Sequence, residues 1–333
     1  MHKPSLAAFL SYAGFGMLSV CCLVSCVVLL FSCLSCLTCL EAQERVRSHQ
    51  ERFASSTAKA QLAEAEATAR LNQSPKDVKA LTDRGLARVG LGLLDAGVAD
   101  FEQAVAVDPN SVESWASLAY GLWRQGKFEP ALAAARKALE RDPEYPSAHW
   151  YTGRLLLLTK GDVQEAVRHL ERALELNPAE AGIHLDLLMA YRAAGDLKKA
   201  WAQLRPLRVL LPPSDTRLLY VEGLLASDFG RSAFAVDCFR QALAIQPQML
   251  EARNGLGVAL VQAERWQEAI EVLTPLAKEQ PLSFRIAYLL ALAYYYAQRG
   301  PEAEQEIRRA LRLNPSSTDA AALLEKVNVH GER

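Results

Sequence analysis

Residues Arg217–Pro247 read RLLYVEGLLASDFGRSAFAVDCFRQALAIQP and form two apolar-periodic segments around a short break at Gly230. In the second segment Ala235, Phe239 and Ala242 are spaced four and three residues apart, so they share one face of a helix. Gly230 can adopt the left-handed conformation that ends a helix. The closing proline ends the second segment, because it lacks an N–H and clashes with the preceding turn. The stretch therefore predicts a helical hairpin.

This hairpin recurs along the chain. Prolines close the units at separations of 34 or 35 residues, at Pro109, Pro143, Pro178, Pro212, Pro247, Pro281 and Pro315. Glycines that suit the turn fall in phase at Gly92, Gly126, Gly161, Gly195 and Gly230. Small residues of the second helix fall in phase at Gly97, Ala131, Ala166, Ala200, Ala235, Ala269 and Ala303. Two further apolar sets, which begin at Phe101 and at Ala104, keep the same phase and predict the packed face of each second helix.

These residues resemble the tetratricopeptide repeat family, whose repeats have a period of about 34 residues and two helices each. The resemblance covers Val78 to Pro315, or about seven repeats. It implies an all-α, right-handed superhelical solenoid. The aromatic residue that the family has early in the first helix is present as Trp115 and Trp150. Repeats six and seven depart from the pattern, because Glu264 and Gln298 stand where the turn glycine is expected.

Two prolines lie inside predicted second helices, in the same register. They are Pro206 and Pro275, and each removes an i→i−4 hydrogen bond, so each predicts a kink. The kink is either tolerated near the end of a short helix or changes the curvature of the array at repeats four and six.

Composition argues for a binding protein without chemistry of its own. The formal net charge of the 333 residues is −1 and there is no Lys/Arg run, which argues against a nucleic-acid partner. No histidine pair at metal-binding spacing, phosphate-binding glycine loop or nucleophile elbow is present. We therefore predict a protein that is not an enzyme and has no cofactor, no metal site and no catalytic residue.

The first forty residues are strongly apolar. Leu6–Leu40 contains no charged residue, and we predict that residues 15–40 form an N-terminal transmembrane helix. The run is too long for the apolar region of a cleaved signal peptide. An alternative is a lipoprotein, because Leu23–Cys26 resembles a lipobox with Cys26 as the acylated residue.

The cysteines and the flanking charges bear on the role of this segment. Six of the seven cysteines lie between Cys21 and Cys39, which is not the distribution of a disulfide framework. Four of them share a narrow helical arc that could mediate self-association, or simply fill an apolar segment: Cys22, Cys26, Cys33 and Cys36. The predicted localisation is a bacterial inner membrane. Lys and Arg residues follow the span more than they precede it, which places the repeats in the cytoplasm, whereas the lipobox resemblance favours the periplasm.

The chain thus divides into four predicted parts. Residues 1–40 are the anchor, and residues 41–76 a helical stalk that includes a possible half-repeat cap. Residues 77–315 are the repeat array, and residues 316–333 a C-terminal solvating helix and tail in which Ala321, Leu324 and Val327 face repeat seven.

The predicted function is a membrane-anchored scaffold or adaptor that binds a helical or extended peptide segment of a protein partner. The resemblance implies that the first helices line a concave groove, at the second, fifth, ninth, twelfth and thirteenth residues of each repeat. The candidate groove residues are Tyr120, Trp123, Arg124, Tyr151, Leu155, Met189, Arg192, Arg217, Tyr220, Asn254, Arg285, Tyr288 and Tyr295. Alternatives are a lipoprotein-like assembly factor for an envelope complex and a docking subunit of a membrane enzyme. The rings could also merely fill the superhelix.

Overall fold

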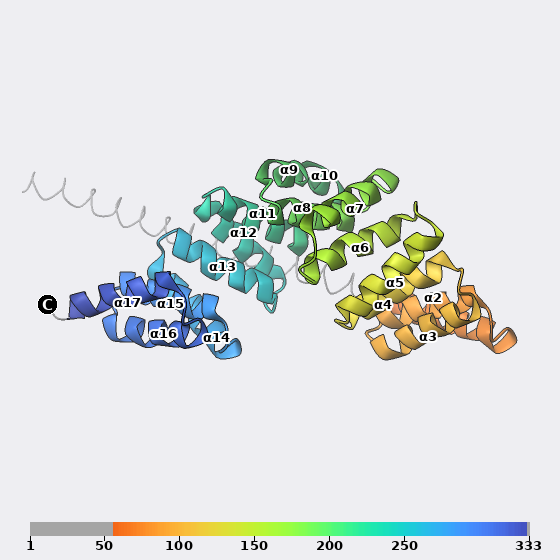
Figure 1. Ribbon diagram of the computed structural model, residues 1–333, viewed down its shortest axis with the longest axis horizontal. Helices are drawn as coiled ribbons and strands as arrows, with labels where there is room; N and C mark the ends of the chain where they lie inside the picture. Colours follow the sequence, from red (N-terminus) through yellow and green to blue (C-terminus); the bar gives the residue numbers. More distant parts are fainter. Residues whose placement is uncertain (1–55, 332–333) are drawn as a thin grey trace, which may run out of the picture. The chain divides into compact units, whose positions relative to one another are not determined.

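The computed structural model describes residues 56–331. These residues form helices and turns without a strand (Figure 1). A helix over residues 56–73 comes first, and helices α2 to α17 follow it.

Seven helical hairpins follow one another, each made of a first helix, the A helix, and a second helix, the B helix. The A helices have 13 residues each and are α2 (Val78–Gly90), α4 (Val112–Arg124), α6 (Pro146–Leu158), α8 (Ala181–Ala193), α11 (Thr216–Asp228), α13 (Leu250–Gln262) and α15 (Phe284–Tyr296). The B helices are α3 (Leu94–Val107), α5 (Phe128–Arg141), α7 (Val163–Leu176), the split pair α9 (Leu197–Ala202) and α10 (Leu204–Leu210), α12 (Ser232–Ile245), α14 (Trp266–Glu279) and α16 (Gly300–Leu313). Helix α17 (Thr318–Gly331) follows the last hairpin. The predicted seven-repeat helical array is confirmed.

The core lies between the helices of each hairpin and the A helix that follows. All members of the predicted B-helix set that runs from Ala131 to Ala303 are fully buried. The sets that begin at Phe101 and Ala104 are buried as well, with at most 2% of any side chain exposed. Most A helices also pack against the A helix of the next repeat, for example α4 against α6 and α13 against α15, whereas α8 and α11 both contact the split helices α9 and α10. We call the surface formed by these neighbouring A helices the A-helix face.

The second residue of every turn between an A helix and its B helix is left-handed, although the sequence varies and the turn of the third hairpin is one residue longer. Gly92, Gly126, Gly195 and Gly230 adopt positive φ angles between 70° and 81°, as predicted. In the third hairpin the left-handed residue is Lys160, with φ 56°, and the prediction for Gly161 is wrong. Glu264 and Gln298 also adopt the left-handed conformation, with φ 57° and 59°. The missing glycines therefore change the strain of these turns and leave their geometry unaltered.

The third repeat begins one residue earlier than its glycine suggested. Helix α6 starts at Pro146, so that His149 rather than Trp150 occupies the place that Trp115 has in the second repeat. Trp115 Nε1 donates a hydrogen bond to the backbone oxygen of Pro109 at 2.9 Å. The Nε2 atom of His149 lies 2.7 Å from the equivalent oxygen of Pro143. A ring nitrogen at this position thus holds the end of the preceding repeat.

The two internal prolines have different outcomes. Helix α14 continues through Pro275, whereas the fourth B helix divides at Gln203 into α9 and α10. Pro206 has no N–H for the carbonyl of Ala202, which explains a break one turn before the proline. Both short helices contact α8 and α11, so the break lies at the junction between the fourth and fifth repeats.

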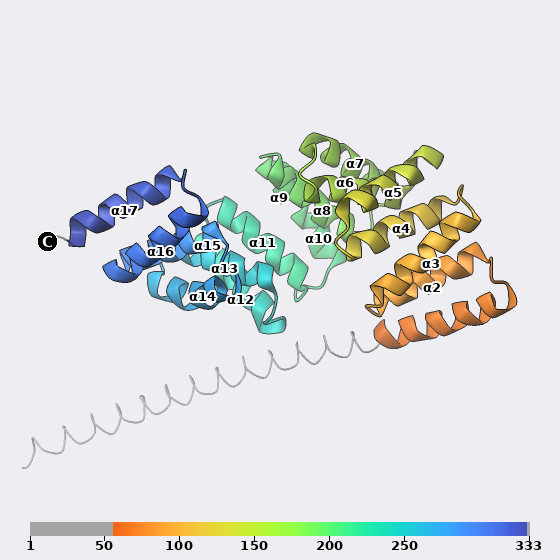
Figure 2. The same cartoon turned by 60° about the horizontal axis from the view of Figure 1, so that its bottom comes forward.

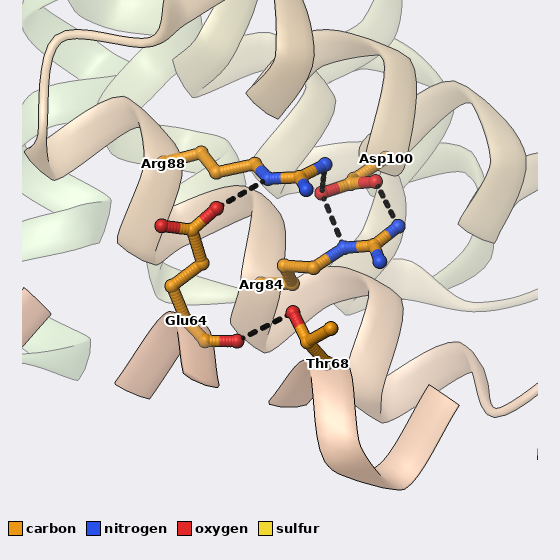
Figure 3. A network of polar contacts seen from close by, with 5 residues as sticks. All are labelled: Glu64, Thr68, Arg84, Arg88 and Asp100. Carbon is orange, nitrogen blue, oxygen red and sulfur yellow. Dashed lines mark hydrogen bonds and ion pairs between the residues drawn. The ribbon is translucent and has the colours of Figure 1, made fainter. Parts of the chain in front are cut away.

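The helix over residues 56–73 lies beside α2 (Figure 2) and buries Ala67 and Leu71. Arg88 of α2 joins it to the array, because its Nε donates to Glu64 Oε1 at 2.9 Å (Figure 3). The same guanidinium donates from Nη1 to Asp100 Oδ2 at 2.9 Å. This helix thus covers one side of the first repeat, and its interpretation as a half-repeat stays a prediction.

At the other end, α17 covers the seventh repeat. Ala320, Leu323 and Val327 are buried, and Leu324 is half-buried against the same cluster. The prediction that Ala321 faces the array is wrong, because this residue is exposed. The buried positions are spaced three and four residues apart, so they begin one residue earlier on the helix than predicted.

The predicted membrane anchor and inner-membrane localisation require correction. Within residues 56–331 no helix has the length and apolar character needed to cross a bilayer. The predicted span at residues 15–40 lies outside the described residues, and so do Cys22, Cys26, Cys33 and Cys36, for which self-association was predicted.

Candidate protein-binding site

Aromatic side chains gather on the A-helix face where α4, α6 and α8 meet. Arg154 of α6 lies at the centre, with its guanidinium carbon 4.3 Å from the ring centre of Trp123 and 4.8 Å from that of Trp150. Asp186 of α8 fixes this arrangement: its Oδ2 accepts from Arg154 Nε at 2.7 Å and from Trp150 Nε1 at 2.5 Å. Three successive A helices are thereby joined by one stack.

Opposing effects act on the pKa of the Asp186 carboxylate. Its burial raises its pKa, while Arg154 and the hydrogen bond from Trp150 act in the opposite direction. The side chains of Arg154 and Asp186 are only 17% and 18% exposed. An ion pair with so little access to water holds the two indole rings in place more firmly than a surface pair would.

Tyrosine rings extend the stack along α4 and α6. The ring of Tyr120 lies 5.9 Å, centre to centre, from both Trp123 and Tyr151. Tyr151 in turn stacks on Trp150 at 5.5 Å. Burial raises the pKa of the Tyr151 hydroxyl, which therefore stays protonated as a hydrogen-bond donor at neutral pH.

At the rim of the stack, Arg124 is exposed and donates from Nη1 to the hydroxyl of Tyr120 at 2.8 Å. We call Tyr120, Trp123, Trp150, Tyr151 and Arg154 the aromatic cluster. All five are half-buried, so part of each side chain reaches solvent.

The structure places Leu155 elsewhere. This predicted groove residue is fully buried in the core with Leu118 and Leu122, because α6 begins at Pro146 and its register differs by one residue from the predicted one. Residues 150 and 154 take the positions that the sequence had assigned to Tyr151 and Leu155.

Trp150 and Arg154 were missed for the same reason, whereas Asp186 was missed because it is the sixth residue of α8, which is not one of the expected groove positions. The sequence did contain the signal. Pro146 favours the first position of a helix. Gly153 is the eighth residue of α6, as Gly85 is of α2 and Gly223 of α11, and each of the three is packed tightly against a residue of the B helix of its own hairpin.

Two of the predicted arginines are already paired. Arg192 of α8 bonds to Asp228 of α11, with Nη2 donating to Oδ1 at 3.1 Å, and this pair links the fourth and fifth repeats. Arg217 bonds to Asp215, the N-cap residue of α11, at 2.9 Å. Met189 lies half-buried against the core of the fourth repeat. These residues stabilise the A-helix face but offer little free charge.

The remaining predicted residues lie on α11, α13 and α15. The ring of Tyr220 lies 6.1 Å from that of Phe239, and its burial raises its pKa. Asn254 accepts from Gln280 at 3.2 Å and lines a small pocket of about 90 Å³ together with Arg285.

Two tyrosines of α15 complete the predicted set. Tyr288 stacks on Phe284 at 5.9 Å, and Tyr295 meets Tyr296 edge to face at 5.1 Å. The aromatic character of the A-helix face is therefore strongest at α4–α6 and at α15.

Within residues 56–331 no group of three or more His, Cys, Asp or Glu side chains is arranged to hold a metal ion. Cys238, the one cysteine of this range, is 2% exposed, and burial raises its pKa to about 12. Such a thiol is not a nucleophile at neutral pH. What the arrangement can do chemically is present rings and cations to another molecule.

Comparisons with known proteins agree with this architecture. Family models described as tetratricopeptide repeat match residues 82–146, 116–166, 157–214, 220–275 and 259–318, which together make up more than half of the chain. The peroxisomal targeting signal receptor of Eremothecium gossypii is 29% identical over 231 residues, or 68% of this chain and 39% of that protein. The TPR repeat-containing protein YpiA of Bacillus subtilis is 23% identical over 193 residues, or 58% of this chain and 45% of that protein.

The chain thus spans less than half of the length of these curated relatives. Among solved structures, the APC/C hetero-tetramer Cut9–Hcn1 superimposes with a TM-score of 0.68 at 18% identity, over 79% of this chain and 52% of that chain. At such low identity the similarity concerns the fold alone.

Proposed function

Because the chain belongs to the tetratricopeptide repeat family, we propose that it is a non-enzymatic scaffold that binds a helical or extended peptide segment of a protein partner on the A-helix face. The aromatic cluster is the centre of the proposed site. Residues of α11, α13 and α15, among them Tyr220, Asn254 and Tyr288, extend it.

The stack of Arg154 between Trp123 and Trp150 carries this proposal. Trp, Tyr and Arg are the residue types that contribute most energy at protein interfaces. Here these side chains are already ordered by contacts with each other and with Asp186, so the binding of a partner would cost little of their conformational entropy. The rings suit apolar side chains of a peptide, and the exposed Arg124 at the rim suits a carboxylate or carbonyl group.

One relative supports the class of partner. By its name the Eremothecium gossypii protein is a receptor for a targeting signal, that is, for a segment of another protein. We extend to this chain only the class of ligand, a segment of a protein, and not the signal itself.

The test is site-specific photocrosslinking in the cells that make the protein. Benzoylphenylalanine replaces Tyr120 in one variant and Ala133, an exposed residue on the outer B helix α5, in the other. We expect one protein to crosslink at position 120 and not at position 133. In a chain that also carries Trp123→Ala, this adduct should fall by about tenfold, as expected when an interface hot spot worth about 1.4 kcal/mol is lost.

Circular dichroism must show that the Trp123→Ala chain keeps its helix content and melting temperature. If it does, and the adduct at position 120 persists undiminished or appears equally at position 133, the aromatic cluster is not the binding site.

A further inference from the structure

The fourth B helix carries an unusual residue next to its break. Trp201 is the fifth residue of α9, just before the break at Gln203. The fifth residue of the other B helices is a buried aliphatic in five repeats, namely Val98, Leu132, Val167, Val236 and Ile270. Trp201 is too large for that space and remains half-buried, with part of its ring facing outward.

A surface pocket of about 370 Å³ forms beside this ring, lined by Lys198, Trp201, Phe229 and Arg231. Phe229, at the turn between α11 and α12, is 43% exposed and meets Trp201 edge to face at 5.3 Å. The guanidinium carbon of Arg231 lies 5.4 Å from the centre of the Trp201 ring. The pocket therefore has an aromatic wall on α9 and another on the next repeat.

The two cations of the pocket lack acidic partners within residues 56–331. Lys198 and Arg231 are both exposed, and neither forms an ion pair there, whereas the neighbouring Lys199 pairs with Glu171 at 3.7 Å. The acidic residues of the adjoining turns are engaged: Asp196 caps α9 by accepting from the backbone N–H of Lys199, and Asp228 pairs with Arg192. Two positive side chains without an acidic partner in the described part of the chain thus line a pocket with aromatic walls.

We propose that this pocket is a second binding site, distinct from the aromatic cluster, for an acidic peptide segment of a partner protein. An apolar side chain of the segment would enter between Trp201 and Phe229. Flanking Glu or Asp side chains would pair with Lys198 and Arg231. Charge complementarity selects this partner, because the described chain leaves both cations unneutralised over an exposed apolar surface.

The test uses fluorescence anisotropy with the full chain and three labelled peptides. The peptides share the same Phe and Leu residues, and the intervening residues are all Glu, all Gln or all Lys. We expect the Glu peptide to bind about tenfold more tightly than the Gln peptide, a difference of about 1.4 kcal/mol. The double variant Lys198→Glu with Arg231→Glu should lose this preference and bind the Lys peptide instead.

Position-matched controls accompany the charge reversal. Lys127 is the exposed residue before α5, as Arg231 is before α12, so Lys127→Glu places the same charge at the same point of another hairpin and should leave binding unchanged. Trp201→Val installs the residue that three other repeats carry and should weaken the Glu peptide about tenfold. Trp123→Ala should have no effect, which separates this site from the aromatic cluster.

Equal binding of the Glu and Gln peptides overturns the proposal, and so does a charge-reversed chain that still prefers Glu. Both charge reversals are on exposed side chains, so their result stands even if circular dichroism shows that Trp201→Val disturbs the fold.

Discussion

Asp100 is the residue on which the polar contacts of the first hairpin converge. It is 3% exposed and accepts from Arg84 Nη2 at 2.6 Å and from Arg88 Nη1 at 2.9 Å (Figure 3). Asp100→Asn keeps the shape but removes the carboxylate that pairs with Arg84 and leaves Arg88 with Glu64 alone. We expect a loss in the free energy of unfolding near the lower end of the roughly 3–5 kcal/mol seen when a buried pair is broken, because both arginines retain some solvent access.

Urea denaturation followed by circular dichroism measures this loss. Glu102→Gln is the matched control, because Glu102 lies on the same helix, is exposed and should change stability by less than about 0.5 kcal/mol. If the two substitutions lower the free energy of unfolding equally, the ion pairs of Asp100 contribute no more to stability than an exposed carboxylate does.

Phe239 explains why α11 and α13 each carry a glycine where they face its ring. Its ring fills the space in which a Cβ at Gly223 or at Gly255 would stand, at 2.8 Å and 2.6 Å from the nearest ring atom. Gly223→Ala should therefore destabilise the protein by about 1–3 kcal/mol. Phe239→Leu, which installs the residue that repeat six has as Leu273, should relieve part of that cost.

A double-mutant cycle on thermal or urea unfolding checks this pair, with an expected coupling of about 0.5–3 kcal/mol. Gly90→Ala serves as the control, because the nearest atom to its Cβ is 3.8 Å away and the substitution should be neutral or slightly stabilising. Strictly additive effects of Gly223→Ala and Phe239→Leu would refute the steric account.

At the scale of elements, the helical hairpins were predicted correctly from the sequence, whereas the register of the third A helix, α6, was predicted one residue too late. Periodic prolines and small residues predict the helices because each must end at a fixed interval and pack closely on its neighbour. The third repeat was misread because Gly161 was matched to Gly126, although the turn there has one more residue and Lys160 takes the left-handed conformation. A glycine nearby does not show which residue has positive φ.

That single shift also determined what could be said about the candidate site. Because of this shift, Leu155 was predicted on the A-helix face and Arg154 was not. No local sequence pattern indicated that Asp186 of the next repeat would bond to Arg154. The contact depends on how two hairpins are placed against each other, which a single repeat does not encode. The same holds for the pocket at Trp201, because its lining comes from α9 and from the turn between α11 and α12.

The non-glycine turns carry strain that can be measured. The left-handed conformation costs an L-residue roughly 1–2 kcal/mol, while glycine loses more backbone entropy on folding. Glu264→Gly should therefore raise the stability by about 0.5 kcal/mol, and Gly230→Ala should lower it by about 1 kcal/mol. Differential scanning calorimetry of the two variants gives the signs. A drop in stability for Glu264→Gly would mean that its side chain makes a contact worth more than the strain.

At the scale of the whole array, neighbouring repeats stabilise each other because they share buried clusters. The buried clusters span adjacent repeats: one holds Leu170 of the third repeat together with Leu225 of the fifth, and another begins at Leu219 and ends in the seventh repeat. In such an architecture each repeat depends on its neighbours for part of its core. Damage to one interface should therefore be felt locally before it is felt globally.

Ala235 offers the sharpest test of this behaviour. It is fully buried where α11 and α12 meet, and Ala235→Arg forces a charged side chain into that contact, for which overpacking alone costs about 1–3 kcal/mol. Hydrogen exchange should show lost protection in repeats four to six, from α8 to α14, while α2–α5 keep theirs. Ala244→Arg on the same helix is the control, because Ala244 is exposed and the arginine can extend into water. Uniform loss of protection along the chain would mean that the repeats fold as one cooperative unit. Unchanged protection in α11 and α12 would mean that residue 235 does not lie in the interface between them.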